Sequence, residues 1–207
     1  MIVYEPATLL TDGLLGALAA WLGWRLYRRP VTAHPAARWW SRMLGLTAVS
    51  ACLGGGYHGF APNFPAAVGT AWWLATMWNI SLLSAALALS LLHEIVPAER
   101  QRPWLWLIAL KLALFAAVAA IHPVFIVVIL DYGVIMIAWV IAALLLCRPW
   151  RGWMLAAIAL SVIAALVQQM HWAPAAAFNH NDLYHVIQAL AMILFYRAGI
   201  LFAGPNT

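Results

Sequence analysis

The chain has 207 residues, of which 66% are hydrophobic and only 8% charged, and its formal net charge is +5. A soluble domain carries about 25% charged residues, so this composition excludes a water-soluble globular protein and indicates an integral membrane protein. A membrane-spanning helix takes about 20 mostly apolar residues. The length therefore allows seven spans and leaves no room for a separate soluble domain.

Seven hydrophobic segments follow one another, separated by polar and proline-containing loops. Proline suits loops and first helical turns, where its missing N–H costs little. Tryptophans, among them Trp40 and Trp150, lie near the segment ends and predict interfacial aromatic belts. We expect one all-α domain over residues 1–207, a seven-helix membrane bundle with spans at about 7–27, 39–60, 68–92, 104–121, 124–147, 152–170 and 182–203.

The arginines predict the orientation. With seven spans they all fall on one side of the membrane, and the loops on the other side contain no Lys or Arg. By the positive-inside rule the N terminus lies outside and the C terminus in the cytoplasm. The positive net charge then reflects topology and contact with anionic membrane lipids, and nucleic acid is not an expected partner. Short loops and an Ala-, Trp- and Arg-rich composition suggest a bacterial inner membrane.

Polar residues gather on the predicted outer side. His58 ends the second span after Gly54–Gly56, and the stretch Asn179–His185 opens the last one. Asp12 lies about five residues into span one, and Asp131 lies about eight residues into span five, or roughly 12 Å deep. Ionisable side chains within a bilayer are expensive to hold and usually mark a functional site.

Histidines and carboxylates together predict a metal site, because these are ligands that zinc prefers. We expect His58 and His185 as ligands, with His180 or Asp182 as the third. Asp182 and His185 share a helix face, and so do Asn181 and His185. The expected supporting residues around His185 are Gln188, which would hold its second ring nitrogen, Tyr184 and Asn181. The glycine run allows close helix approach and is expected to bring His58 toward span seven.

Each feature also has a simpler interpretation. Asp182 is an equally good N-cap, interfacial histidines often serve as polar anchors, and a glycine run often serves packing alone. Asp131 has no basic residue nearby in the sequence, so we expect it to be protonated, hydrated or metal-bound. Lys111 is expected to extend toward the cytoplasmic face in a purely structural role.

Together these residues resemble the alkaline ceramidase/adiponectin receptor superfamily of membrane hydrolases. Its members hold zinc with a histidine of span two and two histidines of span seven, which correspond here to His58, Asn181 and His185. His180, one residue before Asn181, is the substitute for the missing histidine, and the family's serine falls on Gly54. The resemblance implies zinc-activated water and hydrolysis of a lipid amide.

The first functional hypothesis is therefore a zinc-dependent membrane hydrolase acting on a lipid amide or ester at the outer side, with Asp131 or Asp12 as base or water-orienting group. The second is a non-enzymatic binding or sensing protein that holds a metal, haem or lipid between its helices. The third is a small transporter in which Asp131 and Asp12 titrate.

Overall fold

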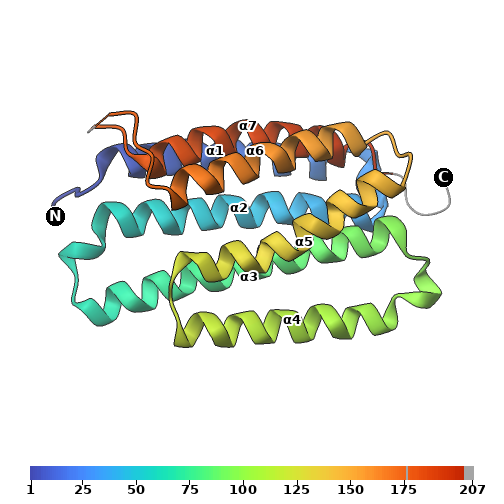
Figure 1. The fold of residues 1–207 in the computed structure, drawn as a ribbon, viewed down its shortest axis with the longest axis horizontal. Helices are drawn as coiled ribbons and strands as arrows, with labels where there is room; N and C mark the ends of the chain where they lie inside the picture. Colours follow the sequence, from blue (N-terminus) through green and yellow to red (C-terminus); the bar gives the residue numbers. More distant parts are fainter. Residues whose placement is uncertain (176, 203–207) are drawn as a thin grey trace.

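The computed structural model describes residues 1–175 and 177–202, and these residues form seven α-helices that lie side by side in alternating directions (Figure 1). Within this part of the chain the sole β-type pairing is an isolated bridge between Ala175 and Phe178. Each of the seven expected segments corresponds to one helix: α1 (Pro6–Tyr27), α2 (Pro35–Phe60), α3 (Ala66–Ile95), α4 (Arg102–Ile121), α5 (Phe125–Leu145), α6 (Arg151–Gln169) and α7 (His180–Gly199). Residue 203, the expected end of the last span, lies outside the described residues.

Local sequence signals begin these helices. Pro6 and Pro35 occupy first positions of α1 and α2, where the missing N–H of proline would have no helical partner. Helix α7 begins with a capping box: the Asn179 side chain accepts from the backbone, and the Asp182 side chain accepts from the backbone N–H of Asn179.

Five of the described helices, α1, α3, α4, α5 and α6, are long and apolar enough to cross a membrane. Helices α2 and α7 have 26 and 20 residues, which is also sufficient length, but they contain more polar residues. The all-helical fold and these five helices indicate a multi-pass membrane protein. The three loops that follow α1, α3 and α5 share one end of the bundle (Figure 1).

Helix α1 lies between α2 and α7 and packs against both, whereas α2 and α7 touch each other only slightly. Helix α3 covers α2, and α6 covers α7. Helix α4 is peripheral: it packs on α3 and α5, and Ala119 is its one buried residue. Residues of α1 are therefore placed to connect the histidine ends of α2 and α7.

The core is aromatic at the end where α7 finishes. Trp40 and Trp139 meet edge to face with ring centroids 5.1 Å apart, and Trp139 stacks on Phe202 at 5.5 Å. The Trp40 indole N–H donates to the backbone carbonyl of Phe195 at 2.8 Å. Trp40 and Trp150 are completely buried, so the expectation that they belong to an interfacial belt is wrong. Their indole nitrogens find partners inside the protein instead.

Candidate functional site

A carboxylate and an imidazole meet between α1 and α7. His185 Nε2 lies 3.1 Å from Asp12 Oδ1, and its Nδ1 lies 3.0 Å from Thr11 Oγ1. Asp12 is 4% exposed and His185 8%. Thr11 Oγ1 also lies within reach of the backbone carbonyls of Ala7 and Thr8. The predicted ligand His185 therefore has a protein partner at each ring nitrogen.

The hydroxyl of Thr11 sets two proton arrangements for this pair, because it carries a single hydrogen. If Thr11 donates to Nδ1, then His185 Nε2–H donates to an ionised Asp12. If Thr11 donates to a backbone carbonyl, Nδ1–H donates to Thr11, and a protonated Asp12 donates to Nε2. The second arrangement holds one proton more than the first, so the pair can take up or release a proton without a change in the heavy-atom geometry.

Asp12 can lie here because the residues of α2 next to it, Gly54 and Gly55, are glycines. A Cβ added to Gly55 would lie 2.7 Å from Asp12 Cβ, and one added to Gly54 would lie 3.6 Å from Asp12 Oδ2. The glycine run therefore does admit a neighbouring helix. We expected that helix to be α7, but it is α1, because α1 lies between α2 and α7. Asp12 Oδ2 is buried and has no hydrogen-bond partner among the described residues.

The other predicted metal ligands of α7 are engaged elsewhere. Asp182 Oδ1 accepts from Thr8 at 2.8 Å, and its Oδ2 accepts from the backbone N–H of Asn179 at 2.7 Å. The N-cap of α7 is Asn179, and Asp182 lies at the third helical position, where it completes the capping box and also connects α7 to α1. The ring of His180 lies 4.7 Å from that of His171, centroid to centroid.

His58 is paired with a residue that the sequence did not single out. Its Nδ1 lies 3.2 Å from Glu5 Oε1, and Glu5 Oε2 lies 3.2 Å from Thr8 Oγ1. The two histidines His58 and His185 are thus linked through α1, by Glu5 at one end and by Asp12 one helical turn beyond Thr8. The sequence does contain a signal for this link through α1. Glu5, Thr8 and Asp12 are spaced three and four residues apart, so they share a helix face.

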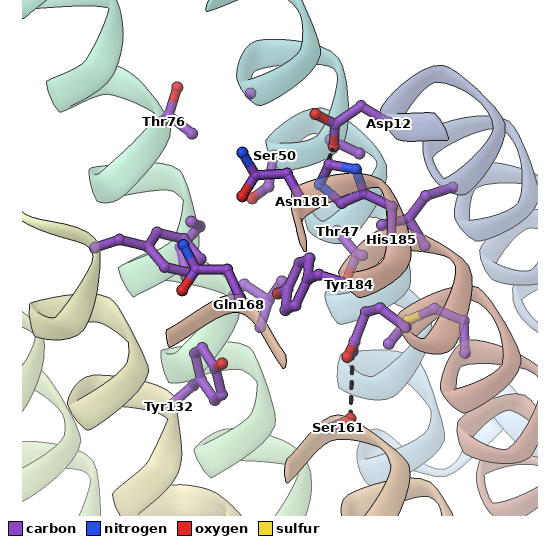
Figure 2. Close-up of a pocket in the computed structure, with 18 of the residues that line it drawn as sticks. Asp12, Thr47, Ser50, Thr76, Tyr132, Ser161, Gln168, Asn181, Tyr184 and His185 are labelled. Carbon is purple, nitrogen blue, oxygen red and sulfur yellow. Dashed lines mark hydrogen bonds and ion pairs between the residues drawn. The ribbon is translucent and has the colours of Figure 1, made fainter. Parts of the chain in front are cut away.

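A cavity of about 370 Å³ opens beside the Asp12–His185 pair, within the volume range of small-molecule sites. Figure 2 shows Tyr184 and Tyr132 projecting into it from different helices, with Asp12 and His185 at one side. The end near His58 and Asn181 is polar. The far end is apolar, lined by Met43, Leu87, Met136, Met192 and Phe195.

Gln188 also lines the cavity, but it does not hold His185. Its Nε2 donates to Ser161 Oγ on α6 at 3.3 Å. The second nitrogen of His185 is held by Thr11, so the expected role of Gln188 is wrong. Tyr184 and Asn181 line the cavity next to His185.

Asp131 lies in a different polar cluster. Lys111 of α4 forms an ion pair with Asp131 Oδ1 and donates to Ser84 Oγ on α3 at 2.7 Å. Asp131 is 0% exposed and is not among the described residues that line the cavity. The expectations of a carboxylate without a basic neighbour and of a Lys111 that extends to the membrane face are therefore wrong.

The predicted zinc ligands do not fit a metal in this arrangement. Both nitrogens of His185 and both oxygens of Asp182 have protein partners. Within residues 1–175 and 177–202, no group of three His, Cys, Asp or Glu side chains is placed to hold an ion. The chemistry available at the cavity is that of a buried carboxylate–imidazole pair with one unpartnered oxygen.

Comparison with known proteins gives a family and no activity. No curated protein and no solved structure matches the chain. One family model matches residues 7–203, which includes all seven helices and the Asp12–His185 pair. The chain belongs to the family DUF6962, a family of unknown function.

Proposed function

We propose that this protein binds a small amphipathic, lipid-like molecule between its helices. The observation that carries the proposal is the cavity itself, which joins a polar end at Asp12 and His185 to an apolar end at Met192 and Phe195. A buried carboxylate oxygen without a partner is costly. A ligand that donates to Asp12 Oδ2 would remove that cost.

The shape of the cavity favours a hydrocarbon chain over a compact polar solute. On α7 its lining residues are His180, Asn181, Tyr184, His185, Gln188, Met192 and Phe195. From His185 to Phe195 they extend over ten residues of the helix, or roughly 15 Å at 1.5 Å per residue. Methionines on α2, α5 and α7 supply flexible apolar walls, which adapt to chains of different length.

Hydrolysis of a lipid amide or ester, which the family resemblance implies, is the second candidate. The Asp12–His185 pair favours it, because such a pair beside a cavity can take a proton from water. The predicted zinc ligands are otherwise engaged, so this candidate depends on the Asp12–His185 pair without a metal. Metal analysis of the purified protein, with assays on lipid amides and esters, tests this candidate. Turnover of a lipid amide or ester without stoichiometric metal, lost in His185→Ala, would replace binding by hydrolysis.

We further propose that all seven helices span a bacterial inner membrane with the N terminus outside and the C terminus in the cytoplasm. The loops after α1, α3 and α5, which share one end of the bundle, carry arginines such as Arg29, Arg100 and Arg148, and arginine marks cytoplasmic loops. A reporter enzyme active only outside the cytoplasm should be inactive when fused to the C terminus and active when fused after Asn63.

The binding proposal is tested by identifying the lipids that stay bound to the protein when it is purified from the membrane. Protein purified in lipid nanodiscs is extracted and its lipids are analysed by mass spectrometry. We expect one amphipathic species enriched to about one per chain, and its loss in Met192→Trp, which fills the apolar end of the cavity. Leu190→Trp, on the exposed face of the same helix, is the matched control. Equal lipid content in both variants and the wild type would refute the proposal.

A further inference from the structure

Aromatic rings surround the polar half of the cavity. Starting at His58, neighbouring rings follow one another through Tyr57, Trp73, Phe125 and Tyr184 to His185, with successive centroids 4.9–6.3 Å apart. All six line the cavity, and they come from four helices, α2, α3, α5 and α7. The series begins and ends at the two histidines that α1 connects.

The same part of the cavity has one carboxylate, and its basic side chains are the histidines His58, His180 and His185. Asp12 supplies the carboxylate, and among the described residues of the lining there is no Lys or Arg. Its Oδ2 is buried without a partner. A head group with a carboxylate or phosphate would face Asp12 with no positive side chain to offset the repulsion.

Aromatic faces with a buried carboxylate are the combination that attracts organic cations. Ring faces carry negative potential and bind ammonium groups within about 6 Å of their centroids, and aromatic cages recognise methylated ammonium groups in this way. A desolvated carboxylate adds a charge partner. Neutral head groups bind far more weakly both to the ring faces and to the carboxylate.

We infer that the cavity selects an alkylammonium: a single hydrocarbon chain that ends in a positively charged nitrogen. The inference rests on the proposed binding function and adds the class of head group. The nitrogen lies among Tyr57, Trp73 and Tyr184 with Asp12 Oδ2 beside it, and the chain extends toward Met192. Arrival of the cation favours the arrangement in which Asp12 is ionised and His185 carries its single proton on Nε2, and the additional proton of the other arrangement is released to solvent.

Four probes with the same short chain separate charge from hydrophobicity: hexyltrimethylammonium, hexylamine, hexanol and hexanoate. Each is titrated calorimetrically into the protein in nanodiscs, with empty nanodiscs subtracted. We expect both ammonium probes to bind at least about tenfold more tightly than hexanol, and hexanoate to bind most weakly. The ratio between the two ammonium probes reports whether ring faces or hydrogen bonding dominate.

Two variants identify the groups responsible. Asp12→Asn should weaken both ammonium probes at least about tenfold and leave hexanol nearly unchanged. Glu99→Gln, which removes an exposed carboxylate at the far end of the bundle, is its control. Tyr57→Leu should weaken hexyltrimethylammonium, whereas Tyr57→Phe, which keeps the ring, should not.

The outcomes distinguish this inference from the binding proposal. Hexanol and the ammonium probes binding equally well, or Asp12→Asn leaving all affinities unchanged, would overturn the alkylammonium inference while a lipid recovered by extraction still supported binding. Failure of all four probes to saturate would also overturn it. The extraction experiment, which uses no added probe, decides the binding proposal by itself.

Discussion

Asp12 and Asp131 are both buried carboxylates, with 4% and 0% exposure, but the protein treats them differently. Asp131 is neutralised internally by Lys111, an ammonium from the peripheral helix α4. Asp12 pairs with a histidine. The Oδ2 atoms of both carboxylates have no hydrogen-bond partner among the described residues, but Asp12 lines a cavity whereas Asp131 is not among the described residues of that lining. Depth alone therefore does not mark a functional carboxylate. What matters is whether the protein supplies the counter-charge or leaves space for a ligand.

Breaking the Lys111–Asp131 pair should give the largest effect. Lys111→Met leaves Asp131 buried without its counter-charge, which costs about 3–5 kcal/mol when one partner of a buried pair is removed. Helix α4 has little else to hold it, since Ala119 is its one buried residue. The free energy of unfolding measures the loss.

The double variant Lys111→Met/Asp131→Leu is the control for this pair. It replaces both charges by apolar groups, and such replacements are often neutral or stabilising. We expect stability within about 1 kcal/mol of the wild type. A double variant as unstable as Lys111→Met would show that the pair does more than neutralise charge.

Gly55→Ala should have the next largest effect, because its added methyl group would lie 2.7 Å from Asp12 Cβ. Overpacking of this kind costs about 1–3 kcal/mol, and it should also displace Asp12 from the cavity and weaken ligand binding. Gly45→Ala on the same helix is the control: its Cβ meets no atom within 4 Å. That change should be neutral or stabilising by up to about 1 kcal/mol through helix propensity. Equal effects of the two substitutions would contradict close α1–α2 packing at Gly55.

Asp12→Asn should change stability by less than about 1 kcal/mol, because the amide oxygen can still accept from His185 Nε2–H. Asp131→Asn, by contrast, removes the charge partner of Lys111 and should be clearly destabilising. Thermal unfolding of the two variants side by side measures the contrast. If Asp12→Asn were the more destabilising of the two, Asp12 would be a structural residue and not a ligand-binding one.

Glu5→Gln should give the smallest effect. The Glu5 side chain is 40% exposed and its partner His58 is 23% exposed, and partly exposed pairs contribute at most about 1 kcal/mol. A shift in the unfolding midpoint as large as that of Gly55→Ala would mean that the α1–α2 contact depends on this pair.

The sequence predicts the helices well, because each hydrophobic segment is bounded by proline or polar loops. Observed helix α4, Arg102–Ile121, differs from the expected 104–121 by two residues. The sequence also places Asp12 and His185 at similar depth, on one side of the bundle. Depth follows from residue counting and constant helical rise.

Helix neighbours could not be predicted in the same way. Nothing in the sequence shows that α1 lies between α2 and α7, so Glu5 and Thr8 were missed and His58 was expected to meet His185 directly. The partner of Asp131 could have been predicted more easily. Lys111 and Asp131 both lie within about three turns of the α4–α5 loop, so an antiparallel helix pair brings them close.

The most direct test of the central claim is a high-resolution crystal structure of protein taken from its native membrane into a lipidic mesophase. We predict continuous elongated density along the cavity, ending in an atom about 2.7–3.2 Å from Asp12 Oδ2, while Asp131 remains paired with Lys111. A cavity that contains only separate water molecules, or a metal ion bound by His58 and His185, would contradict the account.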